Sequence, residues 1–211
     1  MYDLPYFKEV DKQVIVDFMK NNPFALLIGC SSNMPVATQI PFLIEEKEGQ
    51  LYLQGHIMRN TDHHKAFERN SAALCVFTGA HSYVSASWYS EKRTASTWNY
   101  MSVHARGKMH FLGEDDLLKI LEKTTALFEN NEHSLASFQN LPADYVTKLA
   151  KAIIGFEIKV NVLENVFKLS QNRDKESYQT IINELEKSDH DGIKIAEEMK
   201  KRSTKLFPTI Y

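Results

Sequence analysis

The side chains best suited to chemistry gather in short polar segments that interrupt stretches of strand-forming residues. One segment reads GHIMRNT at 55–61 and ends in Arg59, Asn60 and Thr61, where a helix is predicted to begin. A guanidinium, an amide and a hydroxyl in that place suit a phosphate group, because the N–H groups of a helix start add further donors. The alternative is that Arg59 is a surface cation and that Thr61 only caps the helix.

A second segment, STWNY at 96–100, places an indole, an amide and a phenol in succession along a predicted strand. A strand that served only the core would more simply alternate β-branched and polar residues, since buried Trp and Asn side chains need hydrogen-bond partners. A flat wall formed by Trp98 and Asn99, with donors beside it, is the environment that a flavin ring requires. Packing of Trp98 in the core is the alternative.

Other reactive side chains give weaker signals. His63 and His64 follow His56, but adjacent side chains on a helix point about 100° apart, and no Asp or Cys stands at a metal-ligand spacing. The serines of YVSASWY at 83–89 lack the nucleophile-elbow pattern of a hydrolase. The sequence therefore predicts neither a metal site nor a catalytic side chain.

The elements that must position these segments are mainly short strands separated by turns. Their hairpin order and the small number of helices predict an α+β fold built on an antiparallel β-barrel, and the lack of a GxGxxG motif argues against a doubly wound sheet. Gly107 interrupts the longest strand, where a bulge or a close approach of two backbones is expected. In the helix that follows, Leu117 and Phe128 are expected to face inward. The predicted strands are 23–30, 36–46, 50–57, 72–79, 97–112 and 155–169, and the predicted helices include 10–21, 61–70 and 113–130.

Composition limits the classes of partner. The chain has 211 residues with Lys+Arg 25 and Asp+Glu 27, so its net charge of −2 gives no general attraction to nucleic acid or anionic lipid. Cys30 and Cys75 each lie in an apolar run and are expected to be buried thiols of a reducing compartment. No segment reads as a signal peptide or a membrane span, so we expect a cytoplasmic protein without a membrane partner.

The chain changes character after residue 169. Residues 1–169 are expected to form the barrel domain, and the charged, helical segment 170–211 is expected to pack on the barrel or on a dimer partner. A glycine between its two predicted helices and a series of cations weakly suggest a helix-turn-helix, so DNA is a possible partner. A solvated basic helix face is the favoured interpretation, because interspersed glutamates would repel phosphates. The cations are Lys194, Lys200, Lys201, Arg202 and Lys205.

Six segments together give the sequence a family resemblance. They are MYDLPYFK at the start, ATQIPF (37–42), GHIMRN (55–60), YVSASWY (83–89), STWNYMSVHARG (96–107) and FKLSQNR (167–173). With them the chain resembles the PaiB family of FMN-binding negative transcriptional regulators, within the flavin split-barrel group. The resemblance implies a split β-barrel homodimer that holds FMN in the groove between its subunits.

The resemblance also implies a set of FMN-binding residues. Arg59, Asn60 and Thr61 would meet the phosphate, while His56 is included next to them. A second group would line the ring and the ribityl chain, and a third would close the pocket. The second group is Thr38, Gln39, Ile40, Trp98 and Asn99, and the third is Lys168, Gln171 and Asn172.

Two functions of different classes follow from a flavin-binding barrel. The first is a dimeric regulator that represses transcription in response to the state of its FMN. The second is a flavin-dependent oxidoreductase of a small molecule, as in the pyridoxamine-phosphate oxidase-like proteins. No residue requires the second function, because the isoalloxazine carries out the electron chemistry itself. A flavoprotein that stores or scavenges flavin is a third possibility.

Overall fold

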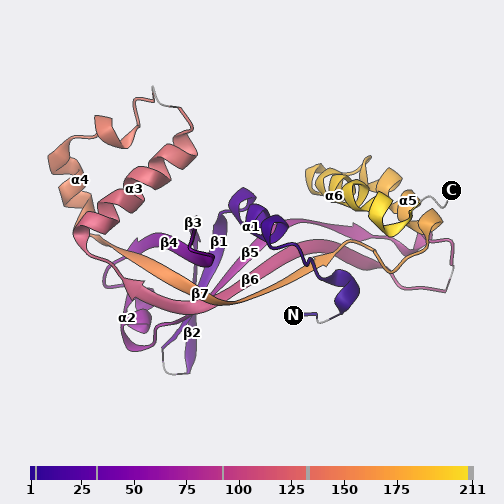
Figure 1. The fold of residues 1–211 in the computed structure, drawn as a ribbon, viewed down its shortest axis with the longest axis horizontal. Coiled ribbons are helices and arrows are strands. Elements are labelled where there is room, and N and C mark those ends of the chain that lie inside the picture. Colours follow the sequence, from indigo (N-terminus) through magenta and orange to yellow (C-terminus); the bar gives the residue numbers. More distant parts are fainter. Residues whose placement is uncertain (3, 32, 92, 132–133, 209–211) are drawn as a thin grey trace. The chain divides into compact units, whose positions relative to one another are not determined.

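The structure is a computed structural model, and it describes residues 1–2, 4–31, 33–91, 93–131 and 134–208. These residues form seven strands and six α-helices, with three short 3-10 helices (Figure 1). The strands are β1 (Phe24–Ser31), β2 (Met34–Pro41), β3 (Leu43–Lys47), β4 (Gln50–Met58), β5 (Ala72–Val84), β6 (Thr97–Phe111) and β7 (Ile153–Lys168). The helices are α1 (Lys12–Asn21), α2 (Asp62–Arg69), α3 (Glu114–Glu129), α4 (Ala143–Ala150), α5 (Lys175–Leu185), α6 (His190–Leu206), η1 (Pro5–Phe7), η2 (Ala86–Trp88) and η3 (Phe138–Asn140).

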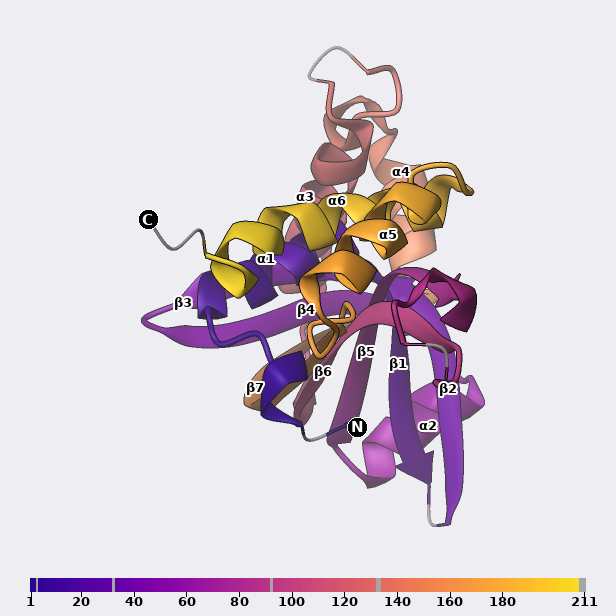
Figure 2. The ribbon, with the colours of Figure 1, turned by 90° about the vertical axis from the view of Figure 1, so that its right-hand side faces the viewer.

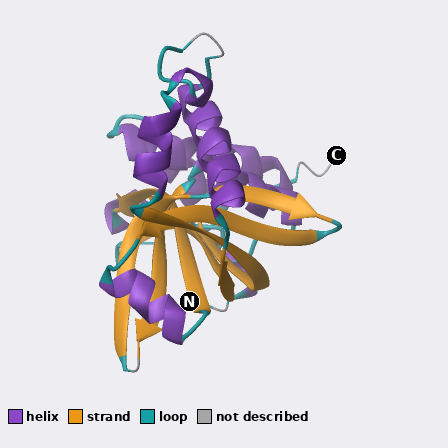
Figure 3. Cartoon of the chain, turned by 90° about the vertical axis from the view of Figure 1, so that its left-hand side faces the viewer, coloured by secondary structure: helices purple, strands orange, loops and turns teal. Residues whose placement is uncertain are grey.

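The described strands form one sheet in the order β2-β1-β5-β6-β7-β4-β3. Figure 3 shows these strands next to one another, and the pairs β1–β2, β1–β5, β3–β4 and β4–β7 are antiparallel. β2 and β3 are the two edge strands of this order. The α+β class and the antiparallel sheet expected of a split barrel are thereby confirmed.

Two local backbone features explain how the sheet turns and packs. The turn between β3 and β4 places Glu48 and Gly49 at positive φ, 52° and 78°, which is the geometry that a two-residue hairpin turn requires. Where β6 passes β7, a Cβ on Gly107 would lie 2.1 Å from the carbonyl oxygen of Lys159, so no side chain fits there. The predicted close backbone approach at Gly107 is confirmed.

The chain divides into two compact units that are assembled from separate stretches of sequence. Unit 1 comprises Met1–Ile15, Thr78–Val103 and Glu164–Tyr211, and unit 2 comprises Val16–Phe77 and His104–Leu163. The strands β5, β6 and β7 contribute residues to both units. The segment 170–211 belongs to unit 1 together with two earlier stretches, and the predicted domain boundary at 169/170 stays a prediction.

Unit 2 has an aromatic and aliphatic core. Phe42, Phe77 and Phe156 are each 0% exposed, and the Phe42 ring centroid lies 5.5 Å from that of Phe77 and 6.1 Å from that of Phe156. Cys75 is fully buried in this core, and burial raises the pKa of its thiol. Cys30 is only partly buried, so the expectation of a second core thiol was wrong.

In unit 1 the helices α5 and α6 lie side by side (Figure 2) and share a buried face. Ile181, Leu185 and Ile195 are each 0% exposed. The Tyr178 hydroxyl donates a hydrogen bond to the Met199 carbonyl oxygen at 2.9 Å, which satisfies the polar end of a buried ring. No helix of the described residues combines the length and the apolar composition that a bilayer crossing requires.

Two sequence expectations about the elements were wrong. The run 36–46 is divided between β2 and β3, because the backbone N–H of Phe42 donates to Pro23 at 2.9 Å and its ring enters the core. In α3, Leu117 is buried as expected, but Phe128 is 51% exposed.

Candidate functional site

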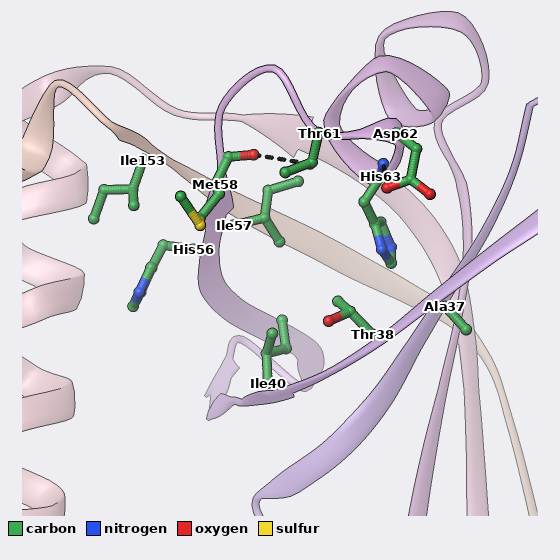
Figure 4. Close-up of a pocket in the computed structure, with 10 residues that line it drawn as sticks. All are labelled: Ala37, Thr38, Ile40, His56, Ile57, Met58, Thr61, Asp62, His63 and Ile153. Atoms are coloured by element: carbon green, nitrogen blue, oxygen red, sulfur yellow. Dashed lines mark hydrogen bonds between the residues drawn. The ribbon is translucent and has the colours of Figure 1, made fainter.

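A cavity of about 350 Å³ lies in unit 2 between β2, β4 and the start of α2 (Figure 4). This volume is at the lower end of the range that small-molecule pockets occupy, roughly 300–1,000 Å³. The wall combines aliphatic side chains with a few converging polar ones. The lining residues are Ala37, Thr38, Ile40, His56, Ile57, Met58, Thr61, Asp62, His63 and Ile153.

β2 contributes Ala37, Thr38 and Ile40 to this cavity, and β4 contributes His56, Ile57 and Met58, so consecutive as well as alternate residues line it. Thr38 and Ile40 are two residues apart on β2 and both line it, as do His56 and Met58 on β4. Gln39 lies between the two β2 residues, is exposed and does not line the cavity. Of the residues predicted for the flavin ring, Thr38 and Ile40 are therefore brought together with His56.

The start of α2 is built by its own side chains. The Thr61 hydroxyl accepts a hydrogen bond from the His64 N–H at 3.2 Å and donates one to the Met58 carbonyl oxygen at 3.0 Å. The Asp62 carboxylate accepts from the His63 N–H at 2.8 Å. Two N–H groups of the first turn are thus already satisfied, which leaves less of this terminus for an external phosphate. The N-cap role of Thr61 is confirmed, and its contact with phosphate stays a prediction.

His63 is the most constrained polar group of the cavity. Its side chain is 5% exposed and its ring stacks on Phe67, with centroids 5.2 Å apart and an interplanar angle of 23°. Among the described residues the Nε2 atom has no hydrogen-bond partner. In Figure 4 the ring extends from α2 toward the β2 residues Ala37 and Thr38. Burial lowers the pKa of His63, and the neighbouring Asp62 carboxylate opposes this shift, so the ring is neutral near pH 7.

The two other histidines of this region differ from His63. His56 lines the cavity and is partly buried, and burial lowers its pKa as well. His64 is buried but does not line the cavity: its Nδ1 accepts from the Asn60 N–H at 3.2 Å, and its Nε2 lies 3.8 Å from a Glu68 oxygen. Within the part of the chain that the structure describes, no three His, Cys, Asp or Glu side chains converge as metal ligands would.

The two remaining residues of the predicted phosphate group lie beside the cavity and do not line it. Arg59 is exposed, and its Nε donates to the Ile153 carbonyl oxygen at 2.8 Å, which fixes the guanidinium next to a lining residue. Asn60 is also exposed and has a positive φ of 64°, in the turn that joins β4 to α2. The lining itself includes the Asp62 carboxylate and, among its described residues, no lysine or arginine.

The predicted site residues of unit 1 do not line this cavity. Trp98 is 51% exposed and packs edge-on against Tyr83, with ring centroids 5.9 Å apart. Asn99 is 0% exposed; its Oδ1 accepts from the Ser170 hydroxyl at 3.0 Å, and its Nδ2 lies 3.5 Å from the Met199 sulfur. The amide of Asn99 is therefore engaged inside unit 1, while Trp98 is about half exposed and contacts His81 as well as Tyr83.

The KLSQN segment forms a tight turn after β7. Lys168 bonds to the Thr97 hydroxyl, and burial, followed by the nearby Arg173, lowers the pKa of this lysine. Gln171 is held within the turn, because its Oε1 accepts from the Leu169 N–H at 2.7 Å and its Nε2 donates to a backbone carbonyl. Asn172 is exposed. The flavin contacts expected of Lys168, Gln171 and Asn172 stay predictions.

Sequence reasoning missed six lining residues, of which His63 and Asp62 are the polar ones. A signal for His63 was available: it lies three and four residues before Ala66 and Phe67, so the three share one face of a helix. The structure shows all three to be buried. The position of Asp62 at the first turn of the helix was also visible in the sequence, but not its approach to a cavity wall.

Comparisons with known proteins add a family and a fold. Residues 1–162 match the family model described as "Putative FMN-binding domain". The "Protease synthase and sporulation protein PAI 2" of Bacillus subtilis (strain 168) is 31% identical over 194 residues, which cover 92% of this chain and 93% of that protein.

Two solved structures are similar in fold. The FAD and heme binding protein from Mycobacterium smegmatis has a TM-score of 0.57 at 17% identity and covers 76% of this chain and 72% of its own. The flavocytochrome Anf3 from Azotobacter vinelandii has a TM-score of 0.56 at 14% identity, covering 79% and 72%. At these identities the likeness concerns the fold alone.

Proposed function

The chain belongs to the PaiB family of FMN-binding proteins, and on this premise we propose that it holds FMN in the cavity of unit 2 and acts as a dimeric, cytoplasmic repressor of transcription. The observation that carries the proposal is the match to the FMN-binding family model over residues 1–162. All residues that line the cavity, from Ala37 to Ile153, fall within that match.

The cavity fits the uncharged part of a flavin better than its phosphate. Ile40, Ile57 and Ile153 offer aliphatic surface against which a flat ring can pack, and the buried His63 Nε2 provides a polar atom without a hydrogen-bond partner among the described residues. Asp62 would oppose a dianion inside the cavity. When bound, the flavin supplies electron or hydride transfer, while the protein binds and orients it.

Arg59 is the group that we assign to the FMN phosphate. Its hydrogen bond to Ile153 holds the guanidinium at the rim, and a guanidinium binds phosphate oxygens strongly through paired N–H donors. The ring and ribityl chain would then extend inward along Thr38, Ile40 and His56. In this arrangement the charged end of FMN stays outside the cavity that contains Asp62.

An exposed sheet edge supports the homodimer. β2 ends the strand order, and its side chains are exposed or only partly buried, with Met34 73% exposed. Phe24 on the neighbouring β1 is 59% exposed. The unpaired N–H and C=O groups of an exposed edge strand are able to pair with another chain, and a second copy of this chain would cover this edge.

The regulatory role rests on the family resemblance. Among the tail cations, Lys200 is paired with Glu186, Lys201 with Glu198 at 2.6 Å, and Arg202 with Glu198 at 2.5 Å. Cations that are already paired with carboxylates have less charge to offer a phosphate backbone. A DNA contact, if the dimer makes one, is therefore not expected to depend on these three residues.

Flavin binding is tested by purifying the protein, recording its absorbance in the flavin bands and identifying the released chromophore. FMN affinity is then compared between wild type and Arg59→Ala. The matched control is Arg69→Ala, which removes another exposed arginine at the end of α2. We expect Arg59→Ala to weaken FMN about tenfold or more and to leave riboflavin affinity unchanged, since a hydrogen bond to a charged group contributes roughly 1.5–3 kcal/mol. A colourless protein that takes up no added FMN would disprove the proposal.

The regulatory role is tested separately. A promoter fragment upstream of the gene should be retarded by the purified dimer in a salt-dependent, sequence-specific manner. Failure at low salt, combined with saturable reduction of the bound flavin by NAD(P)H, would replace the repressor with the oxidoreductase alternative. Analytical ultracentrifugation of the same sample measures the molecular mass of the particle and so tests whether the protein is a dimer.

A further inference from the structure

The His63 Nε2 is a buried polar atom whose partner is missing from the described protein. Its side chain is 5% exposed, it lines the cavity, and no hydrogen bond of the described residues reaches it. An unsatisfied buried polar group costs roughly 1–3 kcal/mol, so native proteins usually give such groups a partner. Because His63 lines the cavity, a molecule bound there is in a position to supply the partner.

The residue next to His63 in the sequence shows that this is a property of the site and not of histidines on α2. His64 is 7% exposed, nearly as buried as His63, yet its Nδ1 is bonded to the Asn60 N–H and its Nε2 approaches Glu68. His64 does not line the cavity. Of these two neighbouring, buried imidazoles, His63 lines the cavity and has a fully buried Nε2 with no hydrogen-bond partner among the described residues, whereas the Nε2 of His64 lies 3.8 Å from a carboxylate oxygen.

The lining restricts what this partner can be. The described wall contains one carboxylate, two histidines, two threonines and five apolar residues, with no lysine or arginine, so it does not favour an anion. A neutral imidazole forms hydrogen bonds with carbonyl, ring-nitrogen and hydroxyl groups. The isoalloxazine ring and the ribityl chain of FMN carry these uncharged groups, whereas its phosphate is an anion.

We propose that the Nε2 atom of His63 forms a hydrogen bond with the isoalloxazine or ribityl part of the bound flavin, and that His63 is thus a flavin-binding residue distinct from the phosphate group at Arg59. This inference rests on the proposed function. Its consequence is that His63 acts equally on FMN and on riboflavin, whereas Arg59 acts on FMN alone. The stacking of His63 on Phe67 holds the ring in place for this contact.

The test measures dissociation constants of FMN and riboflavin for wild type, His63→Phe and the matched variant His64→Phe. Phe keeps an aromatic ring that can stack on Phe67 but removes both ring nitrogens. We expect His63→Phe to weaken both ligands by the same factor, about twofold to tenfold, the value of one net hydrogen bond. His64→Phe should leave both constants unchanged. The thermal midpoint of flavin-free His63→Phe should equal or exceed that of wild type, because an unsatisfied buried nitrogen has been removed.

The outcomes separate this inference from the function on which it rests. If wild type binds neither ligand, the proposed function fails and the inference with it. If wild type binds flavin and His63→Phe binds both ligands as tightly as wild type does, only the inference is overturned. If His63→Phe weakens FMN but not riboflavin, the assignment of His63 to the uncharged part of the flavin is overturned. Should His63→Phe fail to fold, His63→Gln retains a polar group of similar reach, and we expect its affinities to lie within threefold of wild type, while His63→Leu should lose the contact.

Discussion

Two buried polar side chains, Asn99 in unit 1 and His63 in unit 2, differ in how far the protein completes their hydrogen bonds. Beside α5 in unit 1, the buried Ser177 donates its N–H at 2.9 Å and its hydroxyl at 2.6 Å to the carboxylate of the exposed Asp174, and the exposed Ser90 joins the same cluster. Asn99 is likewise bonded to Ser170. In unit 2, by contrast, the His63 Nε2 faces a cavity without a described partner.

This difference separates residues that build the fold from residues that await a ligand. Ser, Asn and His can serve either purpose, so residue type alone does not distinguish them. The number of partners does: a polar group whose hydrogen bonds are complete inside the protein stabilises it, and one whose bonds are incomplete next to a cavity is available to a ligand. Substitutions in unit 1 should therefore act on stability, and substitutions at the cavity on flavin.

The largest effect is expected at Gly107 of unit 2, where the structure leaves no space for a side chain. In Gly107→Ala the new Cβ would lie 2.1 Å from the Lys159 carbonyl oxygen, so β6 and β7 must separate locally. We expect a loss of about 3 kcal/mol or more in the free energy of unfolding, measured by urea denaturation of the flavin-free protein. Gly113→Ala is the matched control, since nothing lies within 4 Å of its Cβ position; because Ala is a poorer N-cap of α3 than Gly, it should lower the free energy of unfolding by about 1 kcal/mol at most. Equal stabilities of the two variants would contradict this packing.

The next largest effect is expected at the buried Asn99 of unit 1, which is bonded to Ser170. Asn99→Ala removes the acceptor of the Ser170 hydroxyl, which is 3% exposed, and leaves a small cavity, so the free energy of unfolding should fall by about 2–3 kcal/mol. Asn183→Ala, on the exposed side of α5, is the control.

The same Asn99 variant tests the sequence resemblance. The dissociation constant of FMN is measured on the folded fraction of Asn99→Ala. A structural Asn99 leaves that constant unchanged while stability falls. A parallel loss of affinity would support the flavin contact that the resemblance implies and would break the separation between the two units.

Local sequence signals predicted much of the sheet, because they depend on neighbouring residues. The turn at Glu48 and Gly49 was predictable from a glycine that tolerates positive φ, and the close approach at Gly107 from a glycine inside a strand pattern. The break at Phe42 was not recognised, although Pro41 within the run 36–46 was a local warning. Phe42 leaves the strand because its ring enters the core, and that is a property of distant contacts.

The site was predicted in part for the same reason. Thr38 and Ile40, two residues apart on β2, both line the cavity, and a helix start at Thr61 was visible in the sequence. Whether a polar side chain finds a protein partner depends on residues that are far apart in the chain, as Asn99 and Ser170 are. The sequence therefore could not show that Asn99 is bonded inside unit 1 while His63 is left facing a cavity.

A smaller effect is expected at the cap of α5. Asp174→Ala removes the side chain that bonds the Ser177 N–H, and helix caps of this kind contribute about 1 kcal/mol. Glu176→Ala is the matched control, because it removes a carboxylate from the same first turn without removing the cap. Urea denaturation should place Asp174→Ala about 1 kcal/mol below wild type and Glu176→Ala within about 0.3 kcal/mol of it. Flavin affinity should not change in either variant.

The smallest effect is the pH dependence of stability, which is expected to fall in a different pH range for each unit. Burial lowers the pKa of His63 and His56 below 6.5, so the folded state disfavours their charged forms; the stability of the cavity region is complete above about pH 6.5 and is lost as the pH falls below that value. Hydrogen bonds from Ser177 lower the pKa of Asp174 from 3.8 to about 2, so the cap of α5 keeps its contribution above about pH 4 and loses it as the pH falls through about 2. Hydrogen exchange between pH 6.5 and 4 should therefore show α2 losing protection before α5 does, with a smaller loss in His63→Phe. Simultaneous loss in both helices, or the same loss in His63→Phe as in wild type, would mean that the buried imidazole does not distinguish the cavity from the rest of the fold.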